Sequence, residues 1–196
     1  MKNSSVAKIL KVLRYSSNIW YLAEGMLGPL FAVFAQKIGG NVFDVAWAWA
    51  LFLIIDGLLI VVVGKISDKY IKGNILMVAG YALNALFTFG YLFVHSTAEL
   101  FFIQIGLGVA SALATPTWDE FYAELEEGLG ERYNAWGLVE GEKELLMGAG
   151  LLVGGVIISR LSFYALFMIM GIIQILATIL ATYCVIKSEV PLKTQI

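Results

Sequence analysis

The sequence predicts an all-α protein that crosses a membrane several times. Of its 196 residues, 60% are apolar and only 14% are charged, whereas a soluble globular domain has roughly 45–50% apolar and about 25% charged residues. The charges are clumped, and between them lie apolar stretches near the length of roughly 20 residues that a helix needs to cross a bilayer. Because unpaired backbone groups are costly in lipid, we expect each stretch to be helical.

Six predicted helices cover most of the chain. They span residues 19–35, 45–64, 75–94, 100–118, 134–159 and 163–186. The fifth is the least clear, because Glu140, Glu142, Lys143 and Glu144 lie in its first turns. We expect a cytoplasmic N-terminal segment (1–17), a six-helix transmembrane bundle (18–187) and a cytoplasmic tail (188–196). Pro191 ends the last helix within a short polar tail, so we also expect the chain to be complete.

Positive charges in the loops predict the orientation. With the N-terminus inside the cell, eleven of the 13 Lys and Arg residues lie in inner segments, and only Lys37 and Arg160 lie in outer loops. Both termini are therefore expected in the cytoplasm, with the protein in the cell membrane. The first helix is not expected to be a cleaved signal peptide, because it lacks a small-residue cleavage pattern and five more helices follow.

The two halves of the helical region resemble each other weakly. Pro29 and Pro116 lie at matching places in the first and fourth helices, and an Ala-Trp pair ending at Trp47 or Trp136 opens the second and fifth. This indicates two three-helix units. Because each unit has an odd number of helices, the second is inverted relative to the first, a 3+3 pattern that many secondary transporters share.

Composition argues against several function classes. A net charge of −2 provides no basic surface for nucleic acid. Cys184 is the only cysteine and His95 the only histidine, so we expect no disulfide within the chain, no metal site and no cofactor. Few side chains are suited to acid–base catalysis as well. An intramembrane enzyme is therefore the weakest candidate.

The loop between the second and third predicted helices carries the most specific motif. A glycine is followed four residues later by an acidic and a basic residue, with a further lysine behind them: Gly64, Asp68, Lys69 and Lys72. This pattern resembles the signature loop of the major facilitator superfamily. The resemblance implies a cytoplasmic gate, in which the Asp68 carboxylate meets the positively polarised N-terminus of the partner's fifth helix. The alternative is a solvated turn whose lysines only enforce orientation.

Two helices carry weaker versions of patterns from the same family. In the fourth, Gly106 and Gly108 look like part of Arg-x-x-x-Gly-x-Gly, with Phe102 in place of the Arg; in the fifth, the stretch from Gly150 to Gly155 is similar to a glycine pattern of the antiporters. The chain thus resembles the N-terminal half of a twelve-helix member. A C2 homodimer would provide two parallel six-helix halves; the alternative is a half that needs a different partner.

The first and second predicted helices each contain an acidic residue, Glu24 in the first and Asp56 near the middle of the second. A charge at the bilayer centre costs at least about 2.5–3.5 kcal/mol. A carboxyl group there exchanges its proton as its access to water changes. We predict that both are proton-coupling residues; the alternative is a fixed hydrogen bond between helices.

Polar and small residues, spaced three or four apart, follow one face of the fourth helix. With nearby aromatic residues they predict a substrate cavity lined by Trp20, Trp49, Phe52, Gln104, Ser111, Thr115, Trp118 and Asp119. The alternative is a packing face between helices. Aromatic rings beside carboxylates suit a sugar-like ligand or a lipophilic cation. Because no basic residue is expected deep in the membrane, we expect a neutral or cationic substrate.

Small residues also mark the fifth helix, where Gly141, Gly148 and Gly155 repeat every seven positions. They let backbones approach closely, and the resemblance implies that the second and fifth helices contact the other half, so we predict a dimer interface there. The resulting hypothesis is a proton-coupled secondary transporter that works as a homodimer by alternating access. Its partners are the bilayer, protons, a small molecule and a second copy. Alternatives are an uncoupled facilitator and a non-transporting scaffold or subunit.

Overall fold

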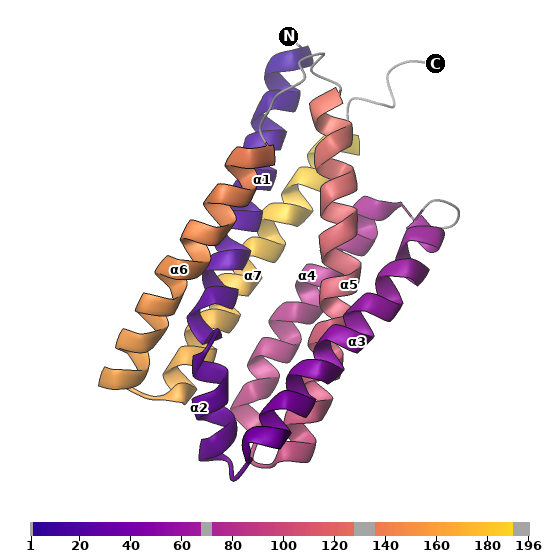
Figure 1. Ribbon diagram of the computed structural model, residues 1–196. Coiled ribbons are helices and arrows are strands. Elements are labelled where there is room, and N and C mark those ends of the chain that lie inside the picture. The colour runs from indigo at the N-terminus through magenta and orange to yellow at the C-terminus, as the bar shows by residue number, and fades with distance from the viewer. Residues whose placement is uncertain (1, 68–71, 128–135, 190–196) are drawn as a thin grey trace.

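The computed structural model describes residues 2–67, 72–127 and 136–189, and this part of the chain is all helical (Figure 1). The helices are α1 (Lys2–Leu27), α2 (Leu30–Lys37), α3 (Val42–Ser67), α4 (Gly73–Gly90), the short 3-10 helix η1 (Tyr91–Phe93), α5 (Thr97–Glu127), α6 (Trp136–Arg160) and α7 (Phe163–Glu189). The all-α prediction is confirmed.

Four of these helices are long and apolar enough to cross a membrane. They are Val42–Lys65 within α3, Gly73–Phe93 across α4 and η1, Thr97–Glu127 in α5, and Phe163–Ser188 within α7. The other two predicted spans correspond to α1 with α2 and to α6, which lie in the same bundle but are not among the four.

The first predicted span is broken into α1 and α2. Gly28 between them has a φ of +27°, which disfavours any residue with a side chain. Pro29 follows it and has no backbone N–H with which to continue the α1 hydrogen-bond ladder. α1 also begins at Lys2, where the sequence predicted a separate segment, and Leu13 in its fourth turn is fully buried.

Pro116 does not break α5, although it lies inside the helix. The hydroxyl of the next residue, Thr117, donates to the carbonyl of Leu113 and lies 3.3 Å from that of Ala114. The carbonyl that loses its backbone donor at Pro116 is that of Ala112, four residues earlier, so these bonds do not replace the missing one. α5 nevertheless continues to Glu127, beyond the predicted end at residue 118.

The helices form an open arc with α3 and α6 at its two ends (Figure 1). α6 packs on α1, α1 on α7, α7 on α4, α4 on α5 and α5 on α3, and a smaller contact joins α1 to α5. α1 begins and α7 ends at the same end of the bundle (Figure 1). α3 and α6 therefore each keep a side without a neighbouring helix among the described parts of this chain.

Glycines set the closest helix contacts. Gly150 and Gly154 of α6 lie directly against the α1 backbone, and a Cβ added at position 154 would overlap the Met26 carbonyl group. On the other side of the bundle, a Cβ at Gly108 of α5 would lie 2.8 Å from the Phe52 carbonyl oxygen of α3. Gly108, Gly150 and Gly154, which belong to the glycine patterns noted in the sequence, thus serve packing within the chain.

Candidate functional site

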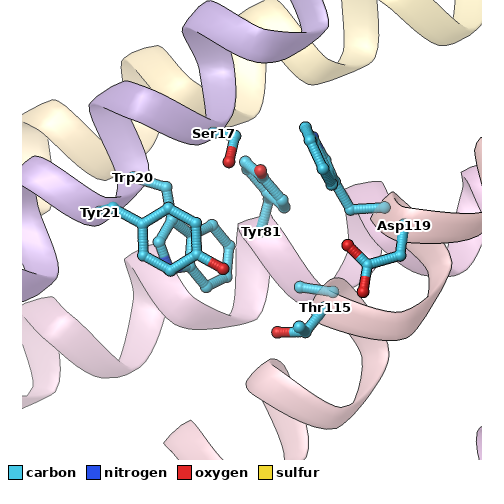
Figure 2. Close-up of a pocket in the computed structure, with 8 residues that line it drawn as sticks. Ser17, Trp20, Tyr21, Tyr81, Thr115 and Asp119 are labelled. Atoms are coloured by element: carbon cyan, nitrogen blue, oxygen red, sulfur yellow. The ribbon is translucent and has the colours of Figure 1, made fainter. Parts of the chain in front are cut away.

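A small pocket opens between α1, α4 and α5 (Figure 2). The residues that line it are Ser17, Trp20, Tyr21, Tyr81, Ala114, Thr115, Trp118 and Asp119. The structure thus brings together four of the eight predicted cavity residues, namely Trp20 from α1 and Thr115, Trp118 and Asp119 from α5. In Figure 2 the α1 side chains face Thr115 and Asp119 across the opening.

The aromatic walls of the pocket are held by ring contacts behind them. Trp20 packs edge-on against Tyr81 of α4, with ring centroids 4.1 Å apart, and Trp118 stacks on Tyr122 with centroids 4.9 Å apart. Both tryptophans are only 6% exposed. The indole Nε1 of Trp118 is buried and has no hydrogen-bond partner among the described residues, so the pocket wall carries an unused donor.

The Asp119 carboxyl group lines the pocket, and an ammonium group and a second carboxylate lie near it. Lys143 of α6 places its Nζ 4.7 Å from the centroid of the Tyr21 ring and 3.4 Å from Glu140 Oε2. The charges of Glu140 and Lys143 both act on Asp119. The sequence showed Lys143 only as a charge in the first turns of the fifth predicted helix, whereas the structure places it against the pocket residue Tyr21. The three groups together carry a net charge of about −1, which favours a cation.

Glu24 is not among the pocket residues but belongs to a cluster that joins three helices. Its Oε1 accepts hydrogen bonds from Asn84 Nδ2 of α4 at 2.7 Å and from Gln174 Nε2 of α7 at 2.9 Å. Both amide side chains are buried. No ion pair to Glu24 is recorded in the part of the chain that the structure describes. A hydrogen bond between helices, the alternative to proton coupling, is therefore present at one of the two carboxylate oxygens.

Gln104 is buried inside the bundle and is not among the pocket residues. It is 1% exposed, and its Nε2 donates to the Tyr91 hydroxyl at 3.1 Å. The Tyr91 ring in turn stacks on Phe167 of α7, with centroids 4.7 Å apart. This side chain links helices, and it lies with the aromatic core at the α2 end of the bundle.

Asp56 forms a separate group on α3. Its carboxyl group lies beside the Ser111 side chain of α5, and its Oδ1 is buried with no hydrogen-bond partner among the described residues. Nearby on the same helix, Trp49 stacks on Phe52 with centroids 5.5 Å apart. Asp56, Trp49, Phe52 and Ser111 do not line the pocket between α1, α4 and α5.

The predicted interface glycines face open space. A Cβ added at Gly141, Gly148 or Gly155 of α6 would meet nothing within 4 Å, unlike one at Gly150 or Gly154. The exposed side of α6 also carries Leu145, Leu152 and Val156.

Two of the four predicted gate residues lie outside the described residues. Asp68 and Lys69 fall there, while Gly64 lies near the end of α3 with open space beside it and Lys72 immediately precedes α4.

Sequence reasoning missed the two amides that hold Glu24. By sequence alone, Asn84 and Gln174 fit packing seams of the third and sixth spans. Each is a primary amide within an apolar helix, the kind of side chain that hydrogen-bonds across helices in membranes. That signal was present in the sequence, but pairing Glu24 with residue 84 and residue 174 required the fold, since the three positions lie on different helices.

Comparison with known proteins places the sequence in a family. Residues 16–196 match the Major Facilitator Superfamily. Over 162 residues, which are 82% of this chain, the sequence is 26% identical to an uncharacterized MFS-type transporter of Methanocaldococcus jannaschii. The matched region is 41% of that protein, so the chain spans less than half the length of this relative.

Proposed function

Because the chain belongs to the Major Facilitator Superfamily, whose members are membrane transporters rather than enzymes, we propose that it is half of a secondary transporter and that a second copy completes it. The dimer takes a neutral or cationic small molecule across the cell membrane by alternating access, and protons drive it. The termini of both copies lie in the cytoplasm, and the six spans of each form two inverted three-helix units.

The pocket between α1, α4 and α5 supports the proposed substrate class. It combines two buried indole rings with an acidic rim. Aromatic faces attract cations, and an acidic rim raises their local concentration. Among the ligands expected from the sequence, an organic cation fits this chemistry best, and Asp119 is the side chain that would contact its charge.

The packing pattern supports the inverted repeat. If α1–α2, α3 and α4 are exchanged with α5, α6 and α7, the α3–α5 contact becomes the α6–α1 contact, and the α4–α5 contact becomes the α7–α1 contact. The α4–α7 contact maps onto itself. Two inverted units within one chain predict this symmetry.

The surfaces of the two helices at the ends of the arc support the proposed homodimer. Apolar side chains cover most of the outer faces of α3 and α6, although α6 also exposes Glu140 and Glu144 in its first turns. α6 adds a row of glycines with open space beside it. Such a row permits close approach of another helix. A two-fold axis between two copies would place α3 and α6 of each against the other and enclose both pockets. In this arrangement Asp68 latches onto the partner's α6 and closes the cytoplasmic side.

Native mass spectrometry of the protein in lipid nanodiscs tests the assembly, and a dimer is expected. A monomer, or a complex with another polypeptide, would contradict the homodimer and favour the scaffold or subunit alternative.

Uptake into proteoliposomes tests the transport. We expect an imposed pH gradient to drive accumulation of phenyltrimethylammonium, a membrane-impermeant aromatic cation. Glu24→Gln and Asp56→Asn should abolish the response to the gradient, whereas Glu124→Gln, a matched change at an exposed position of α5, should not. Uptake that ignores the gradient in every variant would favour the uncoupled facilitator.

A further inference from the structure

A buried acceptor next to Glu24 has no partner among the described residues. Gln174 is fully buried, and its Nε2 donates to Glu24 Oε1 at 2.9 Å. The other end of the same amide, Gln174 Oε1, accepts no hydrogen bond from any described residue. Buried polar atoms are rarely left in this state, so the orphaned oxygen indicates that a donor is present in some state of the protein.

The geometry of a primary amide allows Glu24 itself to be that donor. One of the two N–H groups lies on the same side as the amide oxygen, and a carboxyl group that accepts from it can place its second oxygen beside the amide oxygen. An ionised Glu24 has acceptors only, whereas a protonated one has an O–H donor. The opposite orientation of the Gln174 amide would direct its oxygen at Glu24 Oε1 and would leave two acceptors facing each other.

No opposite charge among the described residues competes for the Glu24 carboxylate. Asn84 of α4 is a neutral donor, and the titratable group that interacts with Glu24 is Tyr91 of η1, which itself accepts from Gln104. Three charged residues of α6 have other partners: Glu142 contacts Arg14 and Asn18, and Lys143 contacts Glu140 and Tyr21. On α5, Asp119 lies at the pocket rim. A neutral carboxyl group suits these surroundings.

We propose that Gln174 is the positioning residue for the coupling proton. In the loaded state, Glu24 Oε2–H donates to Gln174 Oε1 while Gln174 Nε2 donates to Glu24 Oε1, which closes a cyclic pair of hydrogen bonds between α1 and α7. This inference rests on the proposed proton coupling, and it places the proton within one six-helix bundle.

Release of the proton changes the contact between two helices. The Oε2–H bond breaks and the proton passes to water, while the electron pair stays on the carboxylate. Glu24 keeps its hydrogen bonds from Asn84 and Gln174 at Oε1, but Oε2 now faces the Gln174 oxygen as a second acceptor. The α1–α7 contact is weakened, whereas the α1–α4 hydrogen bond from Asn84 remains. The proton thereby changes how α1 is held against α7.

Infrared titration of the protein in nanodiscs tests this pairing with two matched variants. Asn84→Leu and Gln174→Met each remove one donor to Glu24 Oε1, but only Gln174→Met removes the acceptor for the proton. The absorption of the protonated Glu24 carboxyl group is identified by its loss in Glu24→Gln.

We expect the band to differ in frequency between the two variants. Asn84→Leu loses one donor to the carbonyl oxygen but keeps both hydrogen bonds to Gln174, whereas Gln174→Met loses those two bonds and keeps only the donor from Asn84. At a given pH, the ratio of protonated to ionised Glu24 should be roughly two- to tenfold lower in Gln174→Met than in Asn84→Leu, the effect of one hydrogen bond. Equal ratios and equal frequencies in the two variants would overturn the proposal.

A measurement on the unmodified chain covers the case in which Gln174→Met does not fold. With ¹³C in the glutamine side-chain carbonyls, one amide band should change frequency in step with the Glu24 band as the pH is varied. A constant amide spectrum across that titration would show that Gln174 does not hold the proton.

The infrared titration requires no substrate. The Glu24–Gln174 pairing and the transport function can therefore be contradicted independently of each other. Proton-driven uptake with no response of Gln174 would overturn the pairing and leave the transport function standing. If the Gln174 amide band follows the Glu24 titration but no uptake occurs, the pairing stands and the transport function is overturned.

Discussion

Gly154 of α6 lies against the carbonyl group of Met26 in α1, and the carbonyl carbon would be 2.8 Å from a Cβ added at position 154. Real Cβ atoms do not approach backbone this closely. Helix α6 therefore depends on glycine for its contact with α1, on the side of the helix opposite to the row of open glycines.

Gly154→Ala is expected to destabilise the protomer. The added methyl group forces the α1 and α6 backbones apart, and overpacking of this kind costs about 1–3 kcal/mol. Thermal unfolding of the purified protein in detergent measures the effect. Gly148→Ala is the matched control, because its Cβ would meet nothing within 4 Å; equal unfolding temperatures for the two variants would contradict the observed packing.

Gly148→Leu is expected to abolish the dimer while the protomer stays folded. A leucine at this position has room in the isolated chain, but it prevents the close approach of a second helix. Native mass spectrometry reports the oligomer, and thermal unfolding reports the protomer. A dimer that persists in Gly148→Leu would move the interface away from this face of α6.

Asp119→Asn is expected to weaken the binding of phenyltrimethylammonium about fivefold, since a partly exposed charge pair contributes up to about 1 kcal/mol. Binding of an uncharged analogue of the same shape should be unchanged, because the walls formed by Trp20 and Trp118 remain. Isothermal titration of both ligands measures the difference. Equal losses for the two ligands would indicate a structural role for Asp119.

Asp56→Asn is expected to separate proton coupling from substrate exchange. The buried Oδ1 has no partner among the described residues, so it is free to hold a proton during the cycle. The variant should still exchange labelled substrate across the membrane at equal pH, yet should not accumulate it against a gradient. If accumulation survives, Asp56 serves only its contact with Ser111 of α5.

Most of the helical fold could be predicted from the sequence, because apolar stretches of sufficient length have few other structures available in lipid. The element limits were less predictable. α5 runs to Glu127 because its polar last turns pack inside the bundle, where Tyr122 and Glu126 are buried. α1 extends well before the predicted start at residue 19, and Ile9 and Leu13 in this added part are buried.

The candidate site was predicted in part. Trp20, Thr115, Trp118 and Asp119 meet at one pocket, and helical periodicity by itself places the three α5 residues near one another. Gln104 shares that spacing but is buried toward Tyr91. A polar stripe along one helix does not show which neighbouring helix each of its residues meets.

That the chain is an apolar helical membrane protein with acidic groups inside its spans follows from the sequence alone, since composition and hydrophobic length depend on local chemistry. Which glycines of α6 face α1 and which face open space, and which amides hold Glu24, depended on the tertiary fold. Those relationships join residues such as Glu24 and Gln174, which lie on α1 and α7. Contacts between helices that are distant in the sequence depend on how each helix is rotated about its axis in the bundle. The periodicity of residues within one helix does not determine that rotation.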